Sequence, residues 1–106
     1  MDVTLNQGYP DRVGRRYIWC GNATGPTSYT TGGESLNIGQ FNNYIDCVIP
    51  ALSVSGTYIL RGIPSGPGPR ATWKAYIVTA SSGTQVGAGV NLSAEKFVVS
   101  GFAGVY

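Results

Sequence analysis

The chain has 106 residues, of which only 11% are charged, and its formal net charge is +2 at pH 7. This length fits a single domain with its own core, while so small a charge does not indicate a nucleic-acid-binding protein. No apolar run approaches the roughly 20 residues of a membrane-spanning helix, and the abundance of glycine, β-branched and aromatic residues predicts an all-β protein.

The first 14 residues are polar and are interrupted by Gly8, Pro10 and Gly14. Such punctuation predicts an irregular N-terminal arm over residues 1–14, followed by a single β-sandwich domain over residues 15–106. The segment lacks the basic and apolar regions of a classical signal peptide. We therefore expect a soluble chain that is synthesised in the cytoplasm.

Three arginines, Arg12, Arg15 and Arg16, cluster where this arm ends. They either dock on an acidic surface of a partner or form the solvated start of the first strand. A nucleic-acid site would require more basic residues together with stacking aromatics. We expect a protein partner for this cluster and no nucleic acid.

The first strong strand is predicted over Arg15–Cys20. Side chains alternate between the two faces of a strand, so Tyr17 and Trp19 share one face and Ile18 and Cys20 share the other.

A long connection, Gly21–Leu36, follows this strand and contains Tyr29 and the run Gly32-Gly33-Glu34. Paired glycines allow positive φ angles and so predict a sharp turn or a bulge. A carboxylate just after the turn can accept hydrogen bonds from the turn's own amides or from a facing chain. Because connections of this length are usually functional, we interpret Tyr29, Gly32, Gly33 and Glu34 as a contact element.

Further strands are predicted by alternation over Tyr44–Ile49, Thr57–Arg61, Thr72–Thr79 and Lys96–Phe102, with a glycine-weakened strand over Thr84–Val90. In the first of these, Ile45, Cys47 and Ile49 are predicted to share one face, and Pro50 ends the strand because proline cannot donate to a ladder. No segment has the apolar period of a substantial helix. This spacing predicts a compact antiparallel β-sandwich of jelly-roll-like form.

The segment Gly62–Pro69 is rich in proline and glycine and predicts a rigid surface loop. Rigidity lowers the entropy cost of docking, which favours Pro64, Pro67 and Pro69 as partner contacts. The alternative is a simple turn.

The titratable residues do not indicate an enzyme. The chain has no histidine and only five acidic residues, so the usual general base at neutral pH is missing. Glu34 with Asp46 is the least implausible acid pair, and Cys20 and Cys47 have no base nearby in sequence. Two cysteines without histidine do not make a zinc site, so we expect neither metal nor cofactor. Whether these cysteines pack as small hydrophobes or form a disulfide stays open at this stage.

The aromatic residues suggest an alternative function, a carbohydrate-binding β-sandwich module. An exposed aromatic face could stack on sugar rings, although tryptophans in a small sandwich are more often core anchors. The residues concerned are Trp19, Tyr29, Tyr44, Tyr58, Trp73 and Tyr76.

Several short motifs follow one another in a characteristic order. These are Tyr29–Leu36 with its Gly-Gly-Glu-Ser-Leu run, Ile45–Val48, Gly56–Tyr58, Trp73–Tyr76, Val86–Ser93 and Phe97–Phe102. Their order and spacing resemble a group of small structural proteins of tailed bacteriophages, encoded near capsid genes.

The resemblance implies a non-enzymatic β-sandwich protein of the virion, most specifically a capsid decoration or cement protein. Such a protein would bind the outside of the major capsid protein shell and associate with its own copies in a small symmetric oligomer such as a trimer. An alternative within the same class is a head–tail connection or tail component of the virion.

Overall fold

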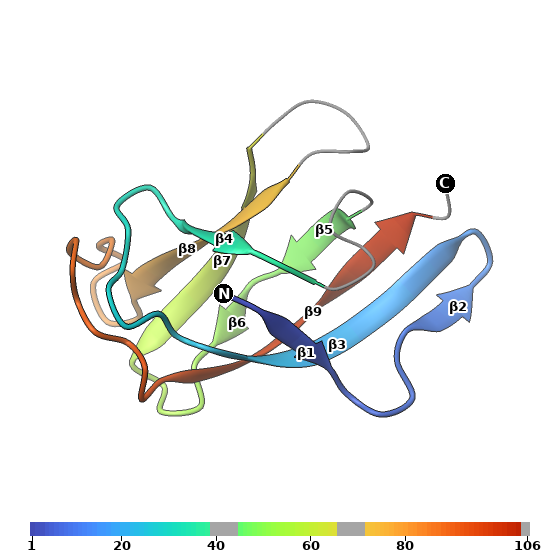
Figure 1. The fold of residues 1–106 in the computed structure, drawn as a ribbon, viewed down its shortest axis with the longest axis horizontal. Helices are drawn as coiled ribbons and strands as arrows, with labels where there is room; N and C mark the ends of the chain where they lie inside the picture. The colour runs from blue at the N-terminus through green and yellow to red at the C-terminus, as the bar shows by residue number, and fades with distance from the viewer. Residues whose placement is uncertain (39–44, 66–71, 105–106) are drawn as a thin grey trace.

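The computed structural model describes residues 1–38, 45–65 and 72–104, which form two antiparallel sheets packed into a sandwich (Figure 1). The predicted all-β, antiparallel sandwich is confirmed. The described ranges contain no helix, and therefore none that is long and apolar enough to cross a membrane.

The larger sheet has five strands, with β9 at its centre between β3 and β5. The strand order is β1-β3-β9-β5, and β2 pairs with β3 beside β1. The strands are β1 (Val3–Leu5), β2 (Asp11–Val13), β3 (Arg16–Thr24), β5 (Ile45–Ile49) and β9 (Lys96–Gly104).

The smaller sheet has four strands in the order β4-β8-β7-β6. The strands are β4 (Glu34–Leu36), β6 (Ala51–Leu52), β7 (Tyr58–Pro64) and β8 (Trp73–Thr79). The chain passes from one sheet to the other at Pro50, which ends β5 as predicted, because proline has no N–H to donate to the ladder.

Residues 1–14 differ from the irregular arm that the sequence predicts, because β1 and β2 both pair with β3. Val3 in β1 is 6% exposed and belongs to the core. Gly8 and Gly14 have φ angles of 89° and 61°, so they form turns between short strands. The residues that indicate irregular structure in the sequence are the turn residues of a small antiparallel unit.

The core lies between the sheets and is built from alternate residues of each strand. In β3 and β9, Trp19, Phe97 and Val99 are fully buried, and in β8, Ala75 and Ile77 are fully buried. Most of the residues between them, such as Cys20, Lys74 and Val98, are at least partly exposed, so each sheet has one core face and one outer face.

β5 departs from simple alternation because its register with β9 shifts between Ile45 and Cys47. Ile45 and Val48 are buried, while Cys47 is half-buried and Ile49 is 46% exposed. The prediction that Ile45, Cys47 and Ile49 share one face is therefore wrong. A β-bulge adds one residue to a strand and reverses the faces beyond it.

The two sheets are joined by hydrogen bonds along both of their sides. On one side, Val3 N–H donates to the Asn37 carbonyl at 2.8 Å, and Asn37 N–H donates to the Met1 carbonyl at 2.9 Å. On the other side, Val54 N–H donates to the Lys96 carbonyl at 2.9 Å, and the preceding Ser53 forms a bridge with Phe97 of β9. The sandwich thus resembles a flattened, partly closed barrel.

Two further predicted elements differ in the structure. The segment Thr84–Val90 forms an isolated bridge between Gln85 and Val78 and no strand. Gly62 and Pro64, predicted in a surface loop, extend β7. A Cβ atom at Gly62 would lie 2.4 Å from the Cβ of Val48 in the facing sheet, so glycine is required there for close packing.

Candidate contact surfaces

The turn before β4 has the geometry that its glycine pair predicts. Gly32 and Gly33 have φ angles of 95° and 114°. Gly33 N–H donates to the Thr30 carbonyl at 3.0 Å, and Thr30 N–H donates to Glu34 Oε1 at 2.6 Å. The sequence left two partners open for Glu34, the turn's own amides or a facing chain. In the structure the partner is an amide of the turn, so this carboxylate stabilises the turn.

Tyr29 is part of the core, which corrects its interpretation as an exposed contact residue. It is 2% exposed, and its hydroxyl accepts hydrogen bonds from Ile77 N–H at 3.1 Å and from Gln85 Nε2 at 3.0 Å. β4 pairs with β8 only as far as Ala75. The Tyr29 hydroxyl therefore supplies an acceptor to the edge of β8 beyond the end of β4.

The connection that contains Tyr29 packs on another loop of the same chain. Its first residues, Gly21 to Thr24, extend β3. Beyond them, Gly25 N–H donates to the Glu95 carbonyl at 2.9 Å and Leu92 N–H donates to the Pro26 carbonyl at 2.8 Å. Its length therefore has an explanation within the chain, without a partner.

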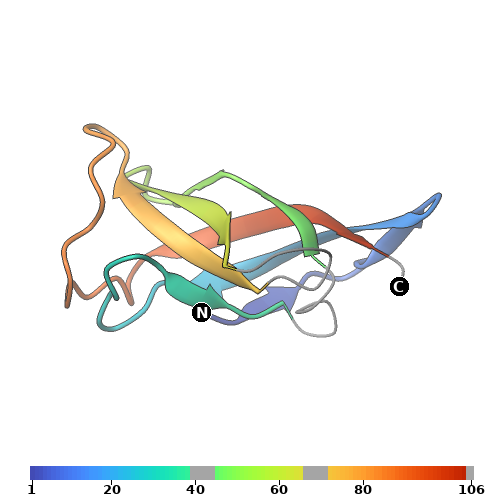
Figure 2. The same cartoon turned by 90° about the horizontal axis from the view of Figure 1, so that it is seen from above.

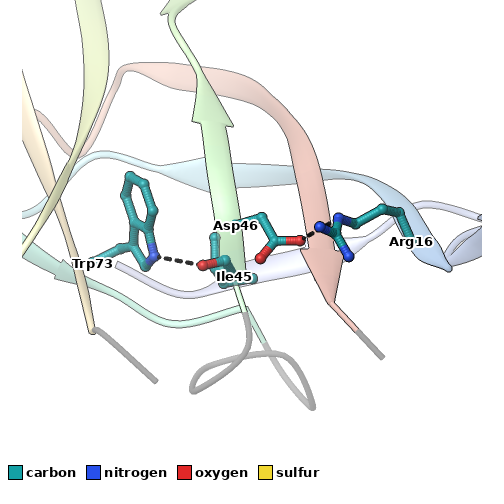
Figure 3. A network of polar contacts seen from close by, with 4 residues as sticks. All are labelled: Arg16, Ile45, Asp46 and Trp73. Carbon is teal, nitrogen blue, oxygen red and sulfur yellow. Dashed lines mark hydrogen bonds and ion pairs between the residues drawn. The ribbon is translucent and has the colours of Figure 1, made fainter. Parts of the chain in front are cut away.

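The predicted arginine cluster lies on the hairpin between β2 and β3. Arg12 and Arg15 are exposed, and Arg12 Nε donates to the Gly14 carbonyl at 3.0 Å. Arg16 forms an ion pair with Asp46 on β5, with Nε and Oδ2 3.0 Å apart (Figure 3). This pair spans β9, where Gly104 is paired with Arg16 and has no side chain to separate the two charges.

The structure does not bring the predicted contact residues into one site. The β2–β3 hairpin lies at one end of the long axis and the turn at Gly32-Gly33 lies toward the other (Figures 1 and 2). Pro64 is exposed at the end of β7, whereas Pro67 and Pro69 lie outside the described residues.

The acidic and thiol groups remain apart. Asp46 pairs with Arg16 on the larger sheet, while Glu34 closes a turn beside the smaller sheet. Within the described ranges there is no group of three or more His, Cys, Asp or Glu side chains that could hold a metal ion. Cys20 and Cys47 are free. Their strands lie on opposite sides of β9, about 9.5 Å apart, which exceeds the reach of a disulfide.

The aromatic residues that the structure describes do not form the exposed face that a carbohydrate-binding module would need. Trp19 and Tyr29 are buried. Trp73 is half-buried, and its Nε1–H donates to the Ile45 carbonyl at 3.1 Å across the interface of the two sheets (Figure 3). Tyr44 lies outside the described residues.

One surface was missed by the sequence predictions, the outer face of the larger sheet. Ile49, Val98 and Phe102 on this sheet are 46%, 51% and 39% exposed. We call this surface the apolar outer face, and it consists of Ile18, Cys20, Cys47, Ile49, Val98 and Phe102. The pairing of Ile18 with Cys20 on one strand face was visible in the sequence, but alternation alone does not show which face is covered.

Comparison with known proteins gives no relative for the chain. No protein family, no curated protein and no solved structure matches it.

Proposed function

We propose that this chain is a non-enzymatic structural protein of a virion, most specifically a capsid decoration protein on the outside of a major capsid protein shell. The order of motifs from Tyr29 onward supports this proposal. The β-sandwich fold is the fold class that the resemblance implies.

The structural observation that carries the proposal is the exposed β2–β3 hairpin. Arg12 and Arg15 are exposed there, and Arg15 has no salt-bridge partner among the described residues. The hairpin lies at an end of the molecule (Figures 1 and 2). It can therefore contact a neighbouring surface without contact between that surface and the rest of the sandwich. Cations in this position favour docking on an acidic surface through electrostatic complementarity.

The turn at Glu34 has a supporting part in this proposal. Because the carboxylate is held by Thr30 N–H, it stabilises the segment that leads into β4. The proposed contact with the shell is made by the hairpin.

Co-sedimentation with purified capsids tests the proposal. The capsids are assembled from purified major capsid protein of a tailed bacteriophage. We expect the protein to pellet with them at low salt, and we expect Arg15→Glu to weaken binding about tenfold, or ~1.4 kcal/mol. Arg61→Glu is the matched control, because Arg61 is an exposed arginine on β7 of the smaller sheet.

Two results would contradict the proposal. Protein that stays in the supernatant with capsids and tails alike would exclude a virion role. Equal loss of binding in the two arginine variants would exclude the hairpin as the contact. Imaging of labelled protein on particles separates the alternatives, because copies at a single vertex indicate a head–tail or tail component.

A further inference from the structure

The apolar outer face is continuous across three adjacent strands. Phe102 of β9 is paired with Ile18 of β3 on one side and with Cys47 of β5 on the other. Residues in such a row lie on the same face of the sheet. The next row along contains Cys20, Ser100 and Ile49. Apolar side chains gathered over several strands differ from isolated exposed residues, because they indicate a surface that another molecule covers.

This face has room for a stable interface. The molecule measures 38 × 29 × 21 Å along its principal axes. A standard protein–protein interface buries about 800 Å² per partner. A face that extends along the longest axis approaches that area whichever of the shorter axes it spans.

Charges of both signs lie at each end of the apolar outer face. Arg16 and Asp46 form an ion pair at one end. Lys96, at the first position of β9, and the preceding Glu95 lie at the other end. A strongly acidic or strongly basic partner would therefore meet repulsion as well as attraction. If a second copy is turned end for end, the Arg16 and Asp46 end of each copy lies over the Glu95 and Lys96 end of the other. Each cation can then face an anion.

The two ends of the face also differ in shape. At the Lys96 end, a hollow of about 330 Å³ is lined by Thr4, Asn22, Val54 and Val98, among others. At the opposite end, Val13 of the β2–β3 hairpin is 57% exposed and is paired with Arg16, on the same face of the sheet. In an end-for-end arrangement the hairpin end of each copy lies over the hollow of the other.

We propose that the apolar outer face binds the same face of a second copy of this chain, in a two-fold symmetric dimer with the two β9 strands running in opposite directions. A two-fold interface must be complementary to itself, and this face has an apolar centre with mixed charges at both ends. The proposal goes beyond capsid binding and concerns the purified protein alone, so its tests contain no capsids.

Sedimentation velocity over a concentration series tests the dimer. We expect wild-type protein to pass from monomer to dimer as its concentration rises, and Phe102→Asp to raise the dissociation constant at least tenfold. Leu52→Asp is the matched control, because Leu52 is 58% exposed on β6 of the smaller sheet and lies outside the proposed interface. Val98→Asp provides a second interface variant, and circular dichroism confirms that each variant folds.

The two half-buried thiols give a second, independent readout. Cys20 and Cys47 are free and belong to the apolar outer face. We expect their rate of alkylation to fall as the protein concentration rises, and to stay constant in Phe102→Asp protein.

The proposal fails if wild-type protein remains monomeric up to about 1 mM, or if Phe102→Asp and Leu52→Asp dissociate equally. Thiols that are protected only when capsids are added would assign this face to the shell, and would also overturn the dimer. Failure of the capsid experiment with an intact dimer would overturn the proposed function alone.

Discussion

Single side-chain acceptors at Glu34 and Tyr29 hold the chain where it passes from the larger to the smaller sheet. Glu34 accepts a hydrogen bond from Thr30 N–H, and the Tyr29 hydroxyl accepts one from Ile77 N–H inside the core. Ile77 N–H is buried and requires an acceptor, whereas the exposed bond from Thr30 N–H fixes the shape of the turn. Both residues therefore have a structural role in the fold.

Replacement of Glu34 should show this role directly. We expect Glu34→Ala to lower the free energy of unfolding by about 1 kcal/mol, because Thr30 N–H loses its acceptor, and Glu34→Gln to cost less because its amide oxygen can still accept. Denaturant unfolding measures both. Thr31→Ala, at an exposed neighbour in the same turn, is the control. If Glu34→Ala matches that control, the hydrogen bond does not stabilise the turn.

At the scale of the strands, glycine and the bulge in β5 decide how closely the sheets approach. Gly62 in β7 allows contact with Val48 from the facing sheet. The shift after Ile45 keeps Val48 in the core and leaves Asp46 in reach of Arg16. Local departures from regular strand structure thus position both a core contact and a surface ion pair.

Gly62→Ala tests the close approach of the sheets. We expect it to lower the free energy of unfolding by about 1–3 kcal/mol, because the new methyl group overlaps Val48. Gly87→Ala is the control, since its added Cβ would lie at an ordinary 3.8 Å from Val90. Thermal unfolding compares the two variants, and equal melting temperatures would show that the sheets can separate without cost.

The longer strands were predictable from the sequence, whereas their partners were not. Alternation located most of β3, β5, β7, β8 and β9. It could not locate β1, β2, β4 and β6, which are two or three residues long and too short to show a period.

The candidate contact residues were predictable only in part. The glycine pair predicted the turn and the role of Glu34, because the effect is local. The burial of Tyr29 depends on Ile77 and Gln85, which are distant in sequence, so no local pattern shows it. The apolar outer face was missed for the same reason, since it requires knowledge that β9 lies between β3 and β5.

For the whole molecule, the links along its sides matter as much as the core. Hydrogen bonds of Val3 and Asn37 on one side, and of Val54 with Lys96 on the other, join the two sheets. Backbone groups used in this way are not available for pairing with another chain, which protects the sheets from edge-to-edge aggregation. Within the described ranges, the hairpin and the apolar outer face remain exposed and are the proposed partner contacts.

Removal of residues 1–5 should open one of these sides. We expect the loss of buried Val3 alone to lower the free energy of unfolding by about 1.5–3 kcal/mol, with increased aggregation because the edge of β3 is uncovered. Val3→Ala, which keeps the strand, should lose less stability and should not aggregate. Denaturant unfolding and light scattering measure the two effects. An unchanged unfolding midpoint after the deletion would show that β1 behaves as a free arm.

The central position of β9 also bears on how the protein is made. β9 comes after every strand with which it pairs, and it supplies the middle of the larger sheet. During synthesis β3 and β5 therefore emerge before the strand that separates them. Their apolar residues stay exposed until β9 pairs with them, and the β3–β9 pairing joins residues far apart in the sequence. A ribosome that stops before Lys96 releases a chain whose larger sheet has no centre. Only chains that include β9 can therefore complete the larger sheet.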